Sequence, residues 1–223
     1  MPGRQDTKQE RGYRNRSVTM KMWGKPMKKV LILFVALTLL TAGAPAIAAE
    51  DSQADQPVPQ RYRGRMAAMS GPSSGATAFL IFHVDRFATD AEVQVLAETL
   101  GEQGEEALLK AVSATEVAGW LKVGDGLRYH LRVIRTMETP QGRMLIGITD
   151  RPIQFGEIAR SRRSAQYTFG WVQILFDEDG KGEGNMIPTA KINFNEDGVL
   201  EVESFHTQPY RILKVLPEKI KGQ

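Results

Sequence analysis

Short runs of alternating apolar and polar residues, separated by turn residues, dominate the chain from residue 117 to its end. Such period-two runs are typical of β-strands, and Gly, Pro, Asn and Asp between them are typical of tight turns. The turns fall at 124–126, 139–142, 177–180 and 195–198. The strands that they separate are expected at 117–123, 127–138, 143–150, 167–176, 184–194, 199–205 and 210–216. This pattern predicts a meander of antiparallel strands.

One strand and two helices are expected before this meander. Residues 76–87, ATAFLIFHVDRF, have a continuous apolar centre that suits a buried strand. Thr89 and Glu92 form a capping box that predicts a helix ending near Gly101, and a second short helix is expected over 103–113. We therefore expect an α+β domain, with a mostly antiparallel curved sheet of six to eight strands and two short helices near its N-terminal end. A sandwich or a partial barrel is the alternative.

Residues 27–49 have the pattern of a secretory signal peptide. Two lysines precede an apolar run over 30–40, and an Ala-x-Ala pattern then leads to Glu50. The run is shorter than the roughly 20 residues that a membrane-spanning helix needs. We therefore predict cleavage near Glu50 and export to the periplasm or the extracellular space. The basic extension over 1–26 is interpreted as a mis-assigned start or a long n-region.

The chain contains no cysteine, so it has no disulfide, no thiolate metal site and no residue for lipoprotein acylation. A mature chain without a transmembrane anchor is expected. Residues 1–49 hold nine of the 29 basic residues and two of the 26 acidic ones, which leaves 20 basic and 24 acidic residues in 50–223. Because the mature chain is then mildly acidic, nucleic acid binding is not expected.

The segment 50–75 is polar and rich in Pro, Gly, Ser and Gln. This composition predicts a disordered leader, followed by a single domain over 76–223. The leader contains Arg61, Arg63 and Arg65. These arginines have two interpretations, contact with an anionic envelope surface or a solvated tail.

Two acidic turns superficially resemble a calcium loop. A loop opened at Asp177 would need an oxygen ligand at Lys181 and a bidentate glutamate at Pro188, so its ligand set is incomplete. Two hairpin turns, in which Asp or Asn supports the turn and Gly takes a positive φ, explain the pattern better.

No compact catalytic or metal-binding motif is present. The three histidines have no ligand spacing, so neither a metal nor a cofactor is predicted; they are His83, His130 and His206. The chain lacks a cysteine nucleophile and a Gly-x-Ser-x-Gly elbow, so no catalytic residue is assigned. A hydrolase would need carboxylates that converge with a histidine in the fold. The candidate carboxylates are Asp150, Glu157 and Glu203.

A long connection over 150–170, DRPIQFGEIARSRRSAQYTFG, interrupts the strand pattern. It contains Arg160, Arg162 and Arg163, and guanidinium groups in a loop suit carboxylate or phosphate ligands. These three arginines are the candidate binding residues. A solvated basic loop is the alternative interpretation.

Five segments resemble an uncharacterised family of exported bacterial proteins of unknown function. They are TDAE at 89–92, GEEALLKAV at 104–112, ITDRPIQFGE at 148–157, FDEDGKGEG at 176–184 and TAKINF at 189–194. The resemblance implies one coherent fold over about 76–215, and it implies no activity, cofactor or substrate.

We therefore expect an exported soluble domain that is not an enzyme and that binds a small ligand, an envelope component or another protein. The alternative is a cell-envelope hydrolase with a dispersed site of carboxylates and a histidine.

Overall fold

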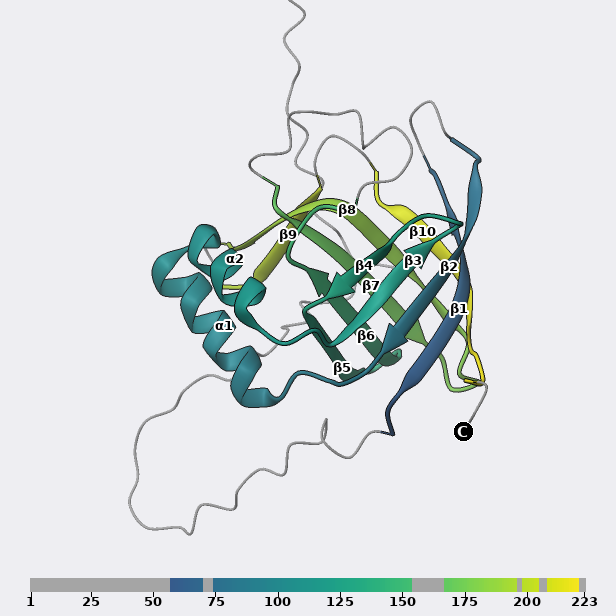
Figure 1. Ribbon diagram of the computed structural model, residues 1–223, viewed down its shortest axis with the longest axis horizontal. Coiled ribbons are helices and arrows are strands. Elements are labelled where there is room, and N and C mark those ends of the chain that lie inside the picture. Colours follow the sequence, from purple (N-terminus) through teal and green to yellow (C-terminus); the bar gives the residue numbers. More distant parts are fainter. Residues whose placement is uncertain (1–56, 70–73, 154–166, 196–197, 205–207, 221–223) are drawn as a thin grey trace, which may run out of the picture.

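The computed structural model describes residues 57–69, 74–153, 167–195, 198–204 and 208–220 of the chain (Figure 1). These residues form ten strands and two helices. In chain order the elements are β1 (Gln60–Ala67), β2 (Thr77–Val84), α1 (Asp90–Gln103), α2 (Glu105–Ala114), β3 (Gly119–Val123), β4 (Arg128–Leu131), β5 (Val133–Thr139), β6 (Gly142–Thr149), β7 (Phe169–Phe176), β8 (Gly182–Phe194), β9 (Leu200–Ser204) and β10 (Tyr210–Pro217).

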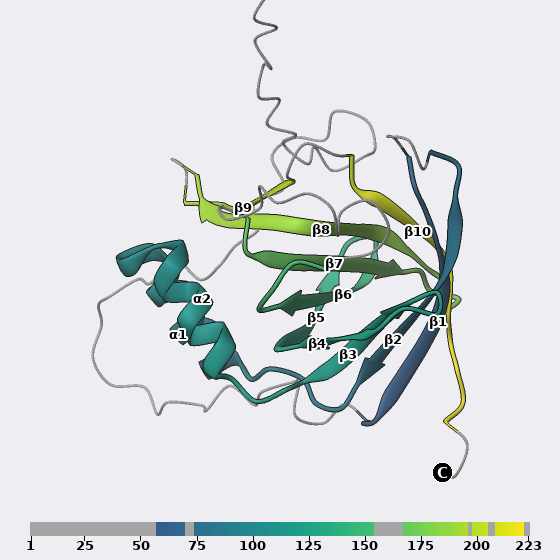
Figure 2. The same cartoon turned by 45° about the horizontal axis from the view of Figure 1, so that its top comes forward.

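The strands form one antiparallel sheet that curls until its two edges nearly meet (Figure 2). Its strand order is β4-β3-β2-β1-β10-β8-β7-β6-β5, and β9 pairs with the C-terminal part of β8. The edge strands β4 and β5 are consecutive in the chain and are separated by Arg132 alone. The backbone N–H of Arg132 donates to the carbonyl of Ile148 on β6, at 2.8 Å. The chain thus passes from pairing with β3 to pairing with β6, and the sheet becomes a nearly closed barrel.

The interior of the barrel is a packed hydrophobic core. Alternate residues of each strand point inward, because successive side chains of a strand lie on opposite faces. Among the largest fully buried side chains of this core are Leu80, Phe82, Leu121, Leu131, Leu145, Ile174 and Ile212. Each contributes roughly 1.5–3 kcal/mol to folding. Gly147 makes room for Phe82, since a Cβ at position 147 would lie 2.8 Å from the ring Cζ.

A second hydrophobic cluster lies outside the barrel, where the helices and β9 cover the outer side of β5–β8. The helix α1 begins at a complete capping box: the Thr89 hydroxyl accepts from the backbone N–H of Glu92, and the Glu92 carboxylate accepts from that of Thr89. The apolar side chains of the helices pack against those of β7 and β8. The buried members of this cluster are Ala88, Leu100, Leu108, Val112, Val133, Phe169, Trp171, Ile187, Ala190 and Ile192.

The expected fold class was wrong. The sheet has ten strands among the described residues, not six to eight, and it is nearly closed. The helices follow two strands and not the one strand that was expected before them, because β1 precedes β2. The main error concerns 60–67, which was assigned to the disordered leader and forms β1, paired with both β2 and β10. A second one concerns the expected strand 127–138, which the bend at Arg132 divides into β4 and β5.

Residues 1–56 lie outside the described residues, so the signal peptide over 27–49 and the basic extension over 1–26 stay predictions. Neither helix of the described part of the chain has the length and apolar character needed to span a membrane.

Candidate binding face of the barrel

The outer side of β1–β4 is polar, basic and aromatic, and it lies on the side of the barrel away from the helices (Figures 1 and 2). We call it the basic face. Its residues alternate along each strand with the buried residues of the core. They are Arg61, Arg63 and Arg65 on β1, Phe79, Ile81 and His83 on β2, Trp120 and Lys122 on β3, and Arg128 and His130 on β4.

The strand register aligns these residues in rows across the sheet. In one row, Arg61 lies opposite His83, and Trp120 lies between His83 and His130. In the next row, Arg63 is opposite Ile81, which is followed across the sheet by Lys122 and Arg128. The third row pairs Arg65 with Phe79. Directly opposite residues in adjacent strands lie close enough for their side chains to interact.

Trp120 is surrounded by cations. The guanidinium carbon of Arg128 lies 4.2 Å from the centroid of the indole, and that of Arg61 lies 5.7 Å from it. The His83 ring stacks on the indole at 5.0 Å between centroids. A cation over an aromatic face is attracted by its quadrupole, with about 0.5–1 kcal/mol at exposed sites. Trp120 therefore restricts the position of Arg128, and more weakly that of Arg61, which also pairs with Glu218.

Phe79 plays the same part in its row. The guanidinium carbons of Arg63 and Arg65 lie 4.9 Å and 5.3 Å from its ring centroid. The ring itself is half exposed. Two arginines on the same face of β1 thus lie over one aromatic ring.

Few acids balance these charges. Glu218 pairs with Arg61 at 3.0 Å and approaches Arg63 at 3.8 Å. Asp85 lies 3.1 Å from the Nε2 of His83, and Asp125 is exposed in the turn between β3 and β4. Among the described residues, no acid forms an ion pair with three of the cations, which are Arg65, Lys122 and Arg128.

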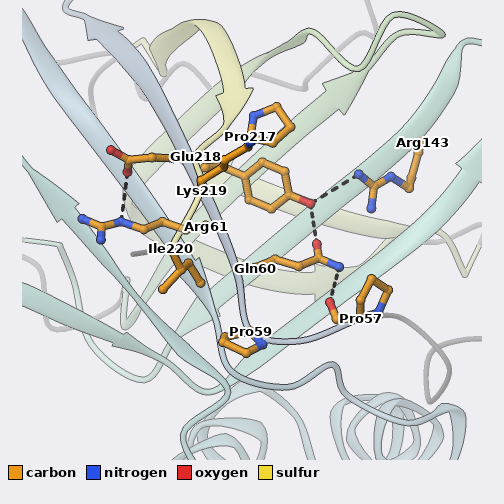
Figure 3. Close-up of a pocket in the computed structure, with 10 residues that line it drawn as sticks. Pro57, Pro59, Gln60, Arg61, Arg143, Pro217, Glu218, Lys219 and Ile220 are labelled. Atoms are coloured by element: carbon orange, nitrogen blue, oxygen red, sulfur yellow. Dashed lines mark hydrogen bonds and ion pairs between the residues drawn. The ribbon is translucent and has the colours of Figure 1, made fainter. Parts of the chain in front are cut away.

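A depression of about 720 Å³ adjoins the basic face at the start of β1 (Figure 3). Its walls come from the start of β1, the end of β10 and Arg143 of β6, and Arg61 belongs both to this depression and to the basic face. Arg143 donates to the Tyr62 hydroxyl at 3.3 Å, which in turn donates to the side-chain oxygen of Gln60. Arg61, Arg143 and Lys219 bring positive charge to this depression, and its one carboxylate, Glu218, pairs with Arg61.

The predicted binding residues Arg160, Arg162 and Arg163 lie outside the described residues, and so do Glu157 and His206. His83 and His130 flank Trp120 on neighbouring strands. The Asp150 carboxylate accepts a 2.8 Å bond from Arg132, and Glu203 lies on β9. Within the described part of the chain, no group of three His, Asp or Glu residues could hold a metal ion.

Glu203 lies near Glu105 and Tyr167, which were not among the candidate site residues. Burial raises the pKa of Glu105 above its ordinary value of 4.5, against the backbone N–H of Ile192 and the charge of Lys191, while Glu203 raises it further. Burial also raises the pKa of Tyr167, and the charges of Glu203 and Glu105 act in the same direction. These groups lie around the N-terminus of α2 and form a small acidic cluster.

The capping carboxylate of α1 shifts the other way. Burial by itself would raise the pKa of Glu92, but hydrogen bonds from the Thr89 backbone and from Arg86 outweigh it and lower the pKa. Arg86 lies 3.0 Å from this carboxylate. Glu92 is therefore a structural acid at the helix start.

The sequence contains a signal for the basic face that composition and net charge do not show. In RYRGRM at 61–66, the arginines alternate with residues that become buried. A period-two alternation is the pattern of a strand with one solvent-facing side.

Comparisons with protein-family models, with curated proteins and with solved structures found no match. The resemblance to exported bacterial proteins therefore stays a prediction.

Proposed function

We propose that this chain is an exported, non-enzymatic binding module that holds an anionic ligand on its basic face. The observation that carries the proposal is the accumulation of Arg, Lys and His on the outer side of β1–β4, around Trp120 and Phe79. The chain over 50–223 has more acids than bases, so this accumulation is local. A surface of one sign of charge attracts ligands of the opposite sign.

The contacts of the arginines support binding to phosphate or carboxylate groups. Arg65 and Arg128 face aromatic rings and have no carboxylate partner among the described residues. A guanidinium group binds phosphate and carboxylate in a fork geometry. Because an aromatic ring already restricts each side chain, less conformational entropy is lost when a ligand binds. These arginines are therefore pre-organised to bind an anionic ligand.

The hydrolase alternative has one observation in its favour, which is the raised pKa of Glu105 near Glu203. A carboxyl group with a raised pKa is a candidate general acid. The backbone N–H of Ile192, however, donates to Glu105 at 3.4 Å and ties this group to β8. No histidine among the described residues adjoins the pair, and we therefore favour the binding module.

Dextran sulfate, a polyanion without a specific structure, tests the proposed function. The exported protein is bound to a dextran sulfate column, and the salt concentration that elutes it is measured. The double variant Arg65→Gln/Arg128→Gln is expected to elute at clearly lower salt. It neutralises fewer sulfate groups than the unmodified protein, so fewer counterions are released when it binds. The matched control is Lys110→Gln/Lys191→Gln, which removes one cation on α2 and one on β8 opposite Glu203 of β9, on the helix side of the barrel. Equal elution of the two double variants would contradict the proposal.

Export is tested separately by mass spectrometry of the protein recovered outside the cytoplasm. We expect a mature N-terminus at residues 49–51, as the Ala-x-Ala pattern predicts. Retention of residues 27–49 would contradict a cleaved signal peptide.

A further inference from the structure

We infer that the anionic ligand of the basic face is the surface of a phospholipid membrane with anionic headgroups. This inference rests on the proposed function, because it names the partner of the same face. It follows from the position of apolar side chains, the shape of the face and the state of its aromatic rings.

The exposed large apolar side chains gather around the basic face. Of the six in the described residues, Val95 alone lies on a helix. The others lie on the basic face, on the neighbouring β10 or at the adjoining strand ends; they are Val58, Met69, Phe79, Leu127 and Leu216. Leu127 is 79% exposed in the turn before β4. Exposed apolar residues on one side of a protein mark a surface for a partner.

Two of these apolar side chains have a cation beside them. Phe79 lies under Arg63 and Arg65. Leu216 on β10 lies opposite Arg63 on β1. Peripheral membrane proteins combine apolar side chains, which enter the headgroup region, with Lys and Arg, which bind the lipid phosphates. The basic face has both components at the spacing of neighbouring side chains.

The convex shape of the face does not fit a partner that needs a groove. The four strands β1–β4, which carry the face, are neighbours on the convex outer side of the barrel (Figure 2). Proteins that bind single-stranded nucleic acid combine a groove with aromatic rings on which the bases stack. Here Arg128 and His83 already pack against Trp120, and two arginines lie over Phe79. The rings serve as supports for cations, which suits phosphate headgroups better than bases.

Co-sedimentation with vesicles tests the inference. The exported protein, with its mature N-terminus determined, is mixed with vesicles of phosphatidylglycerol and phosphatidylcholine or of phosphatidylcholine alone. We expect binding to the anionic vesicles only. Arg65→Gln/Arg128→Gln should weaken it about 25-fold, at about fivefold for each cation near an anionic surface. Lys110→Gln/Lys191→Gln should bind as the unmodified protein does.

A second pair of variants separates membrane insertion from simple charge attraction. Leu216→Ser should weaken vesicle binding about fivefold, because Leu216 is about half exposed beside Arg63 and burial of its apolar area in the interface favours binding. It should leave elution from dextran sulfate unchanged. Val95→Ser is the matched control, since Val95 is 59% exposed on α1, and it should change neither measurement.

The outcomes distinguish the two proposals. Retention on dextran sulfate without vesicle binding would leave the proposed function standing and overturn the membrane inference. Equal binding to neutral vesicles, or tighter binding to a single-stranded oligonucleotide than to anionic vesicles, would overturn it as well. Binding to neither dextran sulfate nor vesicles would overturn both.

Discussion

The two outer sides of the barrel have opposite characters. The outer side of β5–β8 is apolar and is covered by α1, α2 and β9, whereas the outer side of β1–β4 is basic and has no helix or strand over it among the described residues. The difference is visible in single strands. In β7, FGWVQILF, nearly every residue is buried, while in β1, QRYRGRMA, buried residues alternate with arginines. A strand with two buried sides reads as a continuous apolar run, and a strand with one reads as an alternation.

The two sides therefore differ in what they contribute to the folding free energy. Residues of the covered side contribute to the folding free energy through packing. Residues of the basic face contribute little to it, because their charges stay in water. The basic face therefore tolerates charge substitutions, which makes it accessible to tests of binding that do not unfold the protein.

Alanine substitution of one phenylalanine on each outer side tests whether only the covered side stabilises the fold. Phe169→Ala removes a fully buried ring beneath the helices, so we expect a loss of about 3–5 kcal/mol of stability. Phe79→Ala removes a half-exposed ring of the basic face, so we expect a loss below about 1 kcal/mol. Chemical denaturation measures both. Similar losses for the two variants would contradict the division of tasks.

A double-mutant cycle between Trp120 and Arg128 measures how far the basic face is organised by its own rings. The variants are Trp120→Leu, Arg128→Gln and their combination. The 4.2 Å contact predicts a coupling energy of about 0.5–1 kcal/mol in denaturation experiments. Lys122→Gln, on the same strand as Trp120, provides the control, since no cation–π contact joins Lys122 to this ring. A coupling energy near zero would mean that Trp120 does not position the arginine.

Local signals in the sequence predicted the elements that depend on few residues. The Thr89 capping box and the hairpin at 139–142 are present, because a cap and a tight turn are decided within four residues. The closure of the sheet could not be predicted in this way. It depends on the bend at Arg132 and on pairing between β1 and β10, which are about 150 residues apart in the chain.

Three arginines of the basic face were recognised as a possible contact with an anionic surface, but the face itself was not predicted, for two physical reasons. Net charge averages over the whole surface, so a mildly acidic chain concealed a local accumulation of cations. The composition of 50–75 predicted disorder, although the alternation of Arg61, Arg63 and Arg65 within it indicated a strand. Strand register then brings β1–β4 together, and no pattern within one segment specifies that.

A weak pH dependence of stability is expected on the covered side, where the Glu105 carboxylate accepts from the backbone N–H of Ile192 on β8. Because burial raises the pKa of Glu105 above 4.5, its ionisation costs stability in the folded protein. Its contribution is fully present below pH 4.5 and is lost as the pH rises through the raised pKa. The unmodified protein should therefore lose stability relative to Glu105→Gln between pH 4 and pH 7, by less than about 1 kcal/mol because solvent screens a partly exposed carboxylate. Denaturation at the two pH values measures this difference. Glu106→Gln, on the exposed side of the same helical turn, should show no such pH-dependent gain, because the helix N-terminus favours a negative charge. An equal gain there would show that the effect does not come from burial against the covered side of the barrel.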